Sequence, residues 1–183
     1  MDDIRIYLTG FMTSGKSTIG PILANVLGLE FVDLDTVIEA QESKTIVQIF
    51  ETEGEEYFRN IETKCLKEIS NREKIIVSLG GGTMTSERNL NILKSSGRII
   101  YLKVSPDALY KRLKNKIDRP LFKDLVLNNS SEKDFVERIS EMLENREMYY
   151  NQADLVIRTD ITPIGITVDK IAKKIRELLH EKY

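Results

Sequence analysis

Two glycines, a lysine and hydroxyl-bearing residues follow an apolar run near the start of the chain, in the stretch YLTGFMTSGKSTIG. From Gly10 to Ser17 the residues read G-x-x-x-x-G-K-S, the spacing of a loop that binds phosphate through backbone N–H groups. The lysine of such a loop reaches the β- and γ-phosphates, and the hydroxyl after it binds Mg²⁺. We therefore expect a nucleoside triphosphate site that comprises Gly10, Ser14, Gly15, Lys16, Ser17 and Thr18.

A second set of residues that can do chemistry, Asp33-Leu34-Asp35, closes the apolar run FVDLD. Side chains two apart in a strand point the same way, and the carboxyl ends of parallel strands line the ligand crevice of such a sheet. We expect both carboxylates to face the phosphate loop, where one organises Mg²⁺ through water and the other accepts a proton from an attacking hydroxyl. An acidic strand end, or a helix N-cap at Asp35, is the alternative interpretation.

Three further features are ambiguous when each is taken alone. Arg59 and Glu62 share one face of an expected helix, where a solvated ion pair is the default interpretation. Residues 80–82 are three adjacent glycines after the third apolar run, and such a run favours close approach of a ligand over a plain turn. Arg119 and Arg146 each fit an ordinary surface arginine.

Composition and charge narrow the class of protein. The chain has 183 residues, of which 41% are hydrophobic and 31% charged, as in a folded globular domain. A net charge of −2 and a pI near 5.6 give no long-range attraction to nucleic acid or to an anionic membrane. The first residues, MDDIRIYL, lack the regions of a signal peptide, and no apolar run approaches the ~18 residues of a membrane span. We expect a cytoplasmic protein whose one cysteine, Cys65, packs against the core.

Short β-branched runs alternate with longer stretches of helical period. The runs are IRIYLT, FVDLD, KIIVSLG, RIIYLKV and DLVIRT, and a helix is expected from Lys16 to Leu27 after the first of them. Strands that are apolar along their length and separated by helices indicate a parallel sheet covered on both faces. We predict a doubly wound α/β fold with a five-stranded parallel sheet, formed by one domain over residues 1–183.

Several residues mark where the helices should begin and end. Glycines stand at expected helix ends, namely Gly28, Gly54 and Gly97. Thr45 and Gln48 have the spacing of a capping box. Ser105-Pro106-Asp107 places a cap hydroxyl, a proline at the first helical position and an acid in the first turn.

The residues NKID, 115–118, match the N-K-x-D signature by which GTPases recognise guanine. In a GTPase this signature follows a buried strand, whereas here it follows DALYKRLK, a basic stretch of helical period. The third apolar run also ends in SLGGG and not in a strand followed by Asp-x-x-Gly. We therefore assign NKID to a mobile polar segment, with a GTPase switch as the weaker interpretation.

Taken together, the motifs resemble those of the shikimate kinase family from about Ile4 to the last helix. GFMTSGKST, DLD, FRNIE, GGG, RPL and an arginine with a tyrosine four residues later, Arg146 and Tyr150, occur in the family's order. The resemblance implies a P-loop, nucleoside-monophosphate-kinase-like fold with strand order 2-3-1-4-5. It implies substrate-binding helices at approximately 34–62, a mobile lid at approximately 114–128, and a monomer that binds neither nucleic acid nor membrane.

The same resemblance implies a reaction, the transfer of the γ-phosphate of ATP to the 3-hydroxyl of shikimate. It assigns Lys16, Asp35 and Arg119 to catalysis, with Arg119 closing over the phosphoryl group from the lid. It matches Ser17 and Asp33 to Mg²⁺, and Arg112 to the adenine of ATP.

For shikimate, the resemblance matches Asp35, Arg59, Gly81, Gly82 and Arg146. Asp35 would bind the hydroxyls and take the proton, and the glycines would bind through backbone N–H groups. The two arginines would grip the carboxylate, which suits two guanidinium forks and a planar anion. Phe50, Phe58 and Glu62 would form pocket walls.

One residue departs from the family's pattern. Thr13 stands where the family's phosphate loop usually has glycine, so either its φ/ψ suits threonine or the loop is reshaped. A kinase for another small polyol acid, such as gluconate, is the nearest enzyme alternative, and the paired arginines, the triple glycine and Asp35 argue against it. A nucleotide-binding switch or a catalytically silent binding module is the alternative from a different class.

Overall fold

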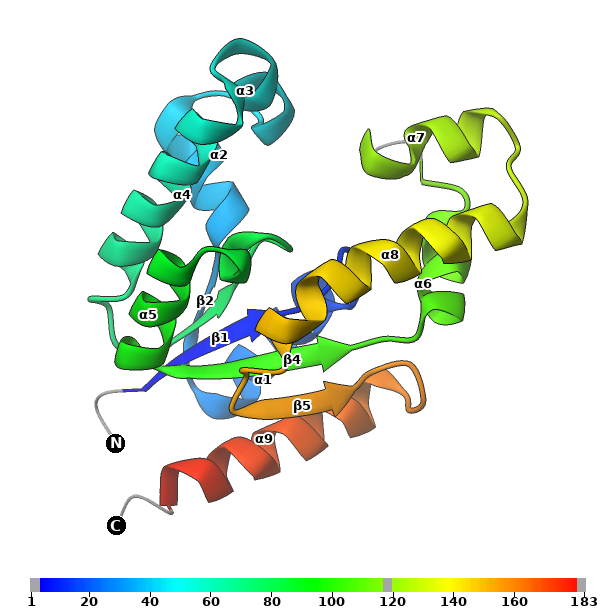
Figure 1. The fold of residues 1–183 in the computed structure, drawn as a ribbon. Helices are drawn as coiled ribbons and strands as arrows, with labels where there is room; N and C mark the ends of the chain where they lie inside the picture. The colour runs from blue at the N-terminus through cyan, green and yellow to red at the C-terminus, as the bar shows by residue number, and fades with distance from the viewer. Residues whose placement is uncertain (1–3, 117–119, 181–183) are drawn as a thin grey trace.

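A computed structural model of the chain describes residues 4–116 and 120–180. Within these residues the sheet consists of five parallel strands, β1 (Arg5–Thr9), β2 (Glu30–Asp33), β3 (Ile75–Ser78), β4 (Arg98–Lys103) and β5 (Leu155–Arg158). Their order is β2-β3-β1-β4-β5 (Figure 1). The predicted α/β class and the predicted strand order are confirmed.

The central strand brings the chemistry-bearing loops to one edge of the sheet. Leu8 of β1 lies level with Ser78 of β3, and Asp33 of β2 pairs with that same Ser78. The phosphate loop after β1, the end of β2 and the glycines after β3 therefore meet at the carboxyl edge. This is the position where parallel sheets bind ligands.

The helices have the following bounds. They are α1 (Lys16–Leu27), α2 (Leu34–Glu42), α3 (Ile46–Thr52), α4 (Gly54–Ile69), α5 (Glu87–Ser96), α6 (Pro106–Leu113), α7 (Pro120–Leu127), α8 (Glu132–Tyr150) and α9 (Ile164–His180), with a 3₁₀ turn η1 (Thr83–Thr85). None of the helices in the described part of the chain is both long and apolar enough to cross a membrane.

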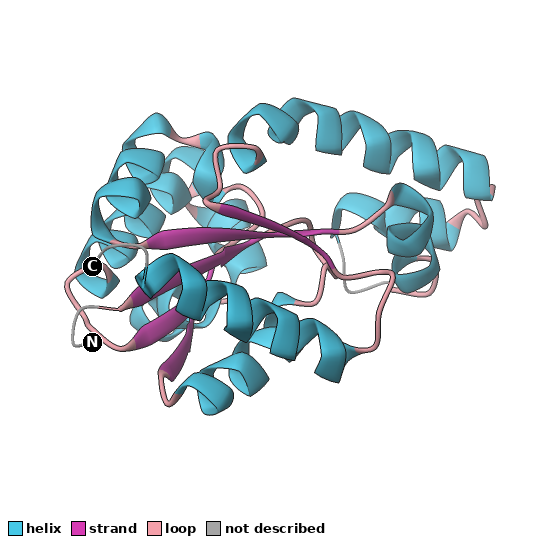
Figure 2. Cartoon of the chain, turned by 90° about the horizontal axis from the view of Figure 1, so that it is seen from below, coloured by secondary structure: helices cyan, strands magenta, loops and turns pink. Residues whose placement is uncertain are grey.

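Helices cover both faces of the sheet, as Figures 1 and 2 show. On one face α1 and α9 pack together on the strands, and Leu23 and Ile171 are fully buried between them. On the other face α2, α4 and α5 form a second core, which includes Cys65 at 0% exposure. Because both faces are covered, β3 and most of β1 and β4 are buried along their length, as the apolar runs predict.

A third apolar cluster joins the phosphate loop to the helices beyond β4. Phe11 of the loop meets Phe122 of α7 edge to face, with ring centroids 6.2 Å apart. Phe122 in turn stacks on Phe135 of α8 at 6.2 Å, and all three rings are buried. The phosphate loop is therefore packed against α7, which lies within the stretch expected to form the lid.

The helix ends follow the sequence signals with two differences. The capping box of Thr45 and Gln48 is present, and Gly28 ends α1 in a left-handed conformation. Ser105 is the N-cap of α6, but its hydroxyl caps nothing, and its backbone N–H donates to Asp160 instead. Gly54 follows the end of α3 as expected and is also the first residue of α4, so the two helices are nearly continuous.

Gly97 follows the end of α5 as expected, but glycine is required there by close packing and not by a left-handed backbone. Its φ of −163° is extended backbone, which any residue can adopt. A Cβ at this position would lie 2.6 Å from the carbonyl oxygen of Arg5 and 2.7 Å from the Tyr7 ring. The close packing of α5 on the central strand therefore requires glycine here.

We expect Gly97→Ala to destabilise the fold by about 1–3 kcal/mol, the usual cost of overpacking a core, and to lower Tm by about 2–4 °C for each kcal/mol. Gly165→Ala is the matched control, because an added Cβ on Gly165 in α9 meets no atom within 4 Å. That variant should be neutral or slightly stabilising, since alanine is the better helix former. Thermal unfolding followed by circular dichroism measures both, and equal melting temperatures would contradict the steric account.

Candidate active site

The loop between β1 and α1 has the backbone shape that binds phosphate. Gly10 and Gly15 have φ of +149° and +109°, values that L side chains rarely adopt. Gly15 is the N-cap of α1, so the helix begins without a capping side chain. The N-terminus of α1, with its partial positive charge, is thus available to an anion.

Lys16 lies across this loop. Its Nζ donates to the carbonyl oxygens of Gly10 and Phe11 at 2.7 and 3.1 Å. Ser17 and Thr18 follow it in the first turn of α1, and both are exposed. A cation and two hydroxyls are therefore gathered where the loop meets the helix, as the motif predicts.

Thr13, where the family's phosphate loop usually has glycine, adopts the backbone conformation of a glycine. It adopts a left-handed conformation with φ of 59°, in the region that glycine usually occupies. Its carbonyl oxygen accepts a hydrogen bond from Arg112 Nη1 at 2.8 Å, and Thr159 Oγ1 binds the neighbouring Ser14 carbonyl at 3.0 Å. These two contacts hold the backbone that follows Thr13, and they help the loop to keep this conformation with threonine in place of glycine. They also place Arg112 beside the loop.

The strand argument for Asp33 and Asp35 is wrong in its geometry. β2 ends at Asp33, and Asp35 lies in the first turn of α2, so the two do not alternate along one strand. Asp33 is the N-cap, and its Oδ1 accepts the N–H groups of Asp35 and Thr36 at 3.1 and 3.4 Å. The N-cap of α2 is thus the last residue of β2, and an alternation of side chains along a strand does not predict where the helix begins.

Asp35 nevertheless faces the carboxyl edge of the sheet, in a low-dielectric setting. Burial raises its pKa to about 6, with further contributions from the negative charges of Asp33 and Glu62. Lys16 acts in the opposite direction and lowers it. A carboxyl group with a pKa of about 6 is suited to accept a proton near neutral pH.

The three glycines after β3 are the point where the remaining side chains converge. A Cβ on Gly80 would lie 3.0 Å from Asp35 Oδ1, and one on Gly81 would lie 3.2 Å from Arg146 Nη1. A Cβ on Gly82 would lie 3.0 Å from Arg59 Nη2. Each glycine is therefore approached closely by one of the side chains expected to bind the substrate.

The carbonyl groups of the same glycines are all hydrogen-bonded within the protein. Gly80 accepts from the Thr83 N–H, Gly81 from the Tyr150 hydroxyl at 2.8 Å, and Gly82 from Thr85. In the described part of the chain, the N–H groups of Gly81 and Gly82 have no acceptor. The loop is thus held by its carbonyls and can offer its N–H groups to a bound anion or hydroxyl.

Arg59 is held at both ends by carboxylates of α4. Its Nη1 pairs with Glu62 at 3.0 Å, and its Nη2 pairs with Glu55 at 3.2 Å. Glu62 is only 1% exposed, so this is no solvated ion pair, whereas Glu55 is 68% exposed and can give way to a competing carboxylate. The ring centroid of Phe58 lies 5.1 Å from the guanidinium carbon, and the Phe58 ring packs against Phe50 at a tilt of 36°.

Arg146 is placed by α8 on the opposite side of the glycines. Its guanidinium carbon lies 5.7 Å from the ring centroid of Phe11. Burial raises the pKa of Tyr150, and the adjacent Arg146 guanidinium partly offsets that shift. Tyr150 also stacks on Tyr101 of β4 at 4.6 Å, so the end of α8 that carries Arg146 is fixed to the sheet.

Arg119, which was expected to close over the phosphoryl group, lies outside the described residues.

The expected Mg²⁺ site is not a cluster of acidic side chains. No group of three or more metal-ligating His, Cys, Asp or Glu side chains occurs among the residues that are described. A Mg²⁺ ion bound with nucleotide needs only one or two protein oxygens besides phosphates and water. The Ser17 hydroxyl is exposed, and no hydrogen bond within the described residues uses Asp33 Oδ2, so both fit that requirement.

Sequence reasoning missed the polar residues that support this site. Glu62 was expected only as a pocket wall or a surface partner of Arg59. Thr63, Thr83 and Asn89 were not expected to contribute at all. All four are buried. A sequence signal did exist, because Glu62 and Thr63 interrupt the otherwise apolar face of α4 formed by Phe58, Ile61, Cys65, Leu66 and Ile69.

The assembled site combines a phosphate loop, a proton acceptor and two cations around a backbone with available N–H groups. The phosphate loop accommodates the triphosphate of a nucleotide. The two guanidiniums of Arg59 and Arg146 suit a planar carboxylate, and Asp35 suits a hydroxyl. This arrangement can transfer a phosphoryl group to the hydroxyl of a small acid.

Comparison with known proteins agrees with this chemistry. The family model described as shikimate kinase matches residues 12–179. The shikimate kinase of Chlorobium phaeobacteroides is 46% identical over 176 residues, which cover 96% of this chain and 93% of that protein.

Solved structures give the same result. The shikimate kinase of Bacteroides thetaiotaomicron has a TM-score of 0.84 and 31% identity, covering 97% of this chain and 98% of that one. The shikimate kinase of Acinetobacter baumannii, solved in complex with shikimate, has a TM-score of 0.81 and 32% identity, covering 98% and 94%. The family model matches residues 12–179, and relatives of that family match the sequence and the fold over nearly the whole chain. The chain therefore belongs to the shikimate kinase family.

Proposed function

We propose that the protein transfers the γ-phosphate of ATP to the 3-hydroxyl of shikimate, which gives shikimate 3-phosphate and ADP. The observation that carries this proposal is the convergence of Asp35, Arg146 and Arg59 on the three consecutive glycines, where an added Cβ would lie 3.0–3.2 Å from one of these side chains at each position. The substrate follows from family membership, and the relative solved with shikimate supports it.

The proposed roles follow from the position of each group. Arg59 and Arg146 hold the shikimate carboxylate from two sides, and the N–H groups of Gly81 and Gly82 bind the substrate between them. Asp35 orients the attacking hydroxyl and accepts its proton as the phosphoryl group is transferred. Lys16 leaves the loop carbonyls and places its charge on the phosphates.

Ser17 and Asp33 would hold Mg²⁺, which neutralises charge on the phosphates when it is bound with ATP. Asp33 already orders the start of α2, so it couples the metal side of the site to the helix that carries Asp35. Arg112, which binds the carbonyl of Thr13, is placed to contact the nucleotide next to the loop. The closure of Arg119 over the phosphoryl group, the monomeric state and the cytoplasmic location stay predictions.

ADP release from ATP and Mg²⁺ tests the function directly. Shikimate, quinate, gluconate and nucleoside monophosphates are supplied in turn, and we expect turnover with shikimate and little with the others. Turnover with gluconate alone would refute the proposal in favour of the nearest enzyme alternative. No turnover with any acceptor would favour a nucleotide-binding module.

We expect Arg59→Lys and Arg146→Lys each to raise KM for shikimate by about 10–150-fold, equivalent to the ~1.5–3 kcal/mol of a hydrogen bond to a charged group. KM for ATP should change little, because neither arginine lies in the phosphate loop. Arg72→Lys is the matched control, since Arg72 pairs with exposed Glu30, the first residue of β2, at the edge of the sheet opposite the site. If only KM for ATP rose in the two variants, the assignment of the carboxylate site would be wrong.

Asp35→Asn should separate catalysis from stability. Loss of the proton acceptor should lower kcat by about 10²–10⁴. The folded-state pKa of about 6 exceeds the ordinary 3.8, so ionised Asp35 costs stability progressively as pH rises between these values and fully above about pH 6. At neutral pH the free energy of unfolding of the variant should therefore exceed that of the parent by up to about 3 kcal/mol, the equivalent of two pKa units. The variant should accordingly unfold at a higher temperature. This advantage should vanish below pH 3.8.

Asp33→Asn is the comparison for that variant, because asparagine is also a good N-cap and should preserve α2. Added Mg²⁺ should restore part of the activity lost in Asp33→Asn and none of that lost in Asp35→Asn. Rescue in the reverse order would show that the two carboxylates are assigned the wrong way round.

A further inference from the structure

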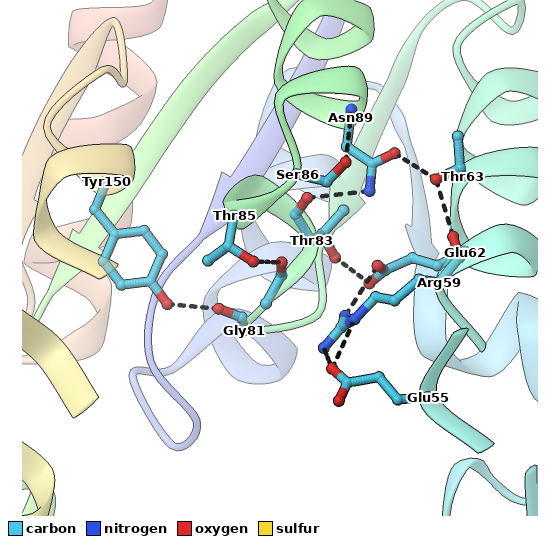
Figure 3. A network of polar contacts seen from close by, with 11 residues as sticks. Glu55, Arg59, Glu62, Thr63, Gly81, Thr83, Thr85, Ser86, Asn89 and Tyr150 are labelled. Carbon is cyan, nitrogen blue, oxygen red and sulfur yellow. Dashed lines mark hydrogen bonds and ion pairs between the residues drawn. The ribbon is translucent and has the colours of Figure 1, made fainter. Parts of the chain in front are cut away.

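A buried polar network lies behind the substrate arginine Arg59, between α4 and the start of α5 (Figure 3). It consists of Glu62, Thr63, Thr83 and Asn89, which are exposed by 1, 6, 0 and 1% respectively. None of their side-chain polar atoms is among the buried atoms without a partner in the described residues. Each of these polar atoms therefore has at least one hydrogen-bond partner, and such buried polar contacts favour one geometry.

Asn89 stands at the centre of the network and joins two elements that are far apart in sequence. Its Nδ2 donates to the carbonyl of Thr83 at 3.1 Å, and its Oδ1 accepts from the Thr63 hydroxyl at 2.8 Å. A carbonyl can only accept, so the amide has one orientation that satisfies both neighbours. The backbone of Asn89 is set in turn by Ser86, the N-cap of α5, whose hydroxyl accepts its N–H.

Both ends of this bridge lead to the proposed substrate site. On the α4 side, the Thr63 hydroxyl also lies 2.9 Å from the Arg59 carbonyl oxygen, so its single proton is shared between that oxygen and Asn89 Oδ1. On the loop side, Thr83 directly follows the three glycines, and its hydroxyl donates to Glu62 Oε1 at 2.7 Å. Glu62 Oε2 holds Arg59 Nη1, as described above. The bridge thus closes a ring that runs from Arg59 through Glu62, Thr83 and Asn89 back to α4.

The ring sets the distance between Arg59 and the glycines. A Cβ on Gly82 would lie 3.0 Å from Arg59 Nη2, so the guanidinium lies close to the Gly82 backbone, and a small movement of α4 relative to the loop shifts it. A guanidinium that grips a carboxylate by two parallel hydrogen bonds is sensitive to such a movement, because both bonds must align.

We propose that Asn89 and Thr63 are positioning residues for the carboxylate of the acceptor. They act through Arg59 and Glu62, and they touch neither substrate nor nucleotide. The proposal rests on the proposed function, since it takes shikimate as the acceptor whose carboxylate Arg59 binds. A purely structural role for the network, holding α4 against α5, is the competing account.

Thr63→Val and Thr63→Ser form the test pair, because valine removes the hydroxyl with little change of shape and serine keeps it. We expect KM for shikimate to rise about 5–10-fold in Thr63→Val through loss of the hydrogen bond, with KM for ATP within about twofold of the parent. Thr63→Ser should remain close to the parent. Asn89→Ala, if it folds, should reproduce the valine variant.

Ile69→Val controls for stability, since Ile69 is a buried residue near the other end of α4 and the substitution also destabilises modestly. It should lower Tm without changing KM for shikimate. A double-mutant cycle then asks whether Thr63 acts through Arg59. In the Arg59→Lys background, Thr63→Val should raise KM for shikimate less than about twofold further.

The outcomes separate the accounts. An unchanged KM for shikimate in Thr63→Val, equal rises in KM for both substrates, or a full multiplicative effect in the Arg59→Lys background would overturn the positioning role. Each of these results leaves the proposed function intact, provided the unsubstituted protein releases ADP with shikimate. Absence of that activity in the unsubstituted protein would overturn the proposed function and this inference together.

Discussion

The absence of side chains at Gly80, Gly81 and Gly82 is the constraint on which the site depends. Three functional groups approach these positions from three elements, namely Asp35 from α2, Arg146 from α8 and Arg59 from α4. A methyl group at any of the three would lie 3.0–3.2 Å from one of those groups. None of the three glycines has a left-handed backbone, so glycine serves here to leave space for these groups and to expose the N–H groups of Gly81 and Gly82. The packing of α2, α4 and α8 around this edge of the sheet is useful only because that space exists.

The charges around the glycines balance only in part, and the imbalance is concentrated at Asp35. Buried Glu62 is compensated by Arg59 and by the hydroxyl of Thr83. Asp35 instead has a raised pKa, chiefly because it is buried and further because the carboxylates of Asp33, Glu62 and Glu39 lie near it, while Lys16 acts in the opposite direction. Ionised Asp35 lowers the stability of the fold, and in the proposed reaction it lies beside the attacking hydroxyl. Such a conflict between stability and function is typical of active sites.

The fold and the phosphate loop were predictable from sequence because they depend on local patterns. Apolar runs separated by stretches of helical period indicate the parallel sheet, and the residue types from Gly10 to Ser17 indicate the shape of the phosphate loop. The position of Asp35 was harder to predict, because three residues are too few to distinguish the end of a strand from the start of a helix. The N-cap at Asp33 places this boundary, so that Asp35 lies in the helix. The network around Asn89 could not be predicted, since it joins residues 26 positions apart whose contact depends on how α4 and α5 pack. The steric role of Gly97 likewise depends on its neighbour in β1.

The central claim is that two arginines beside the glycine loop recognise the carboxylate of the acceptor. Isothermal titration with shikimate and with its uncharged methyl ester tests this claim most directly, because the two ligands share every hydroxyl and differ at the carboxyl group. The account predicts that the ester binds at least about 10-fold more weakly, since it forfeits charge-assisted bonds to Arg59 and Arg146. Equal affinity of the unsubstituted protein for both ligands would contradict it.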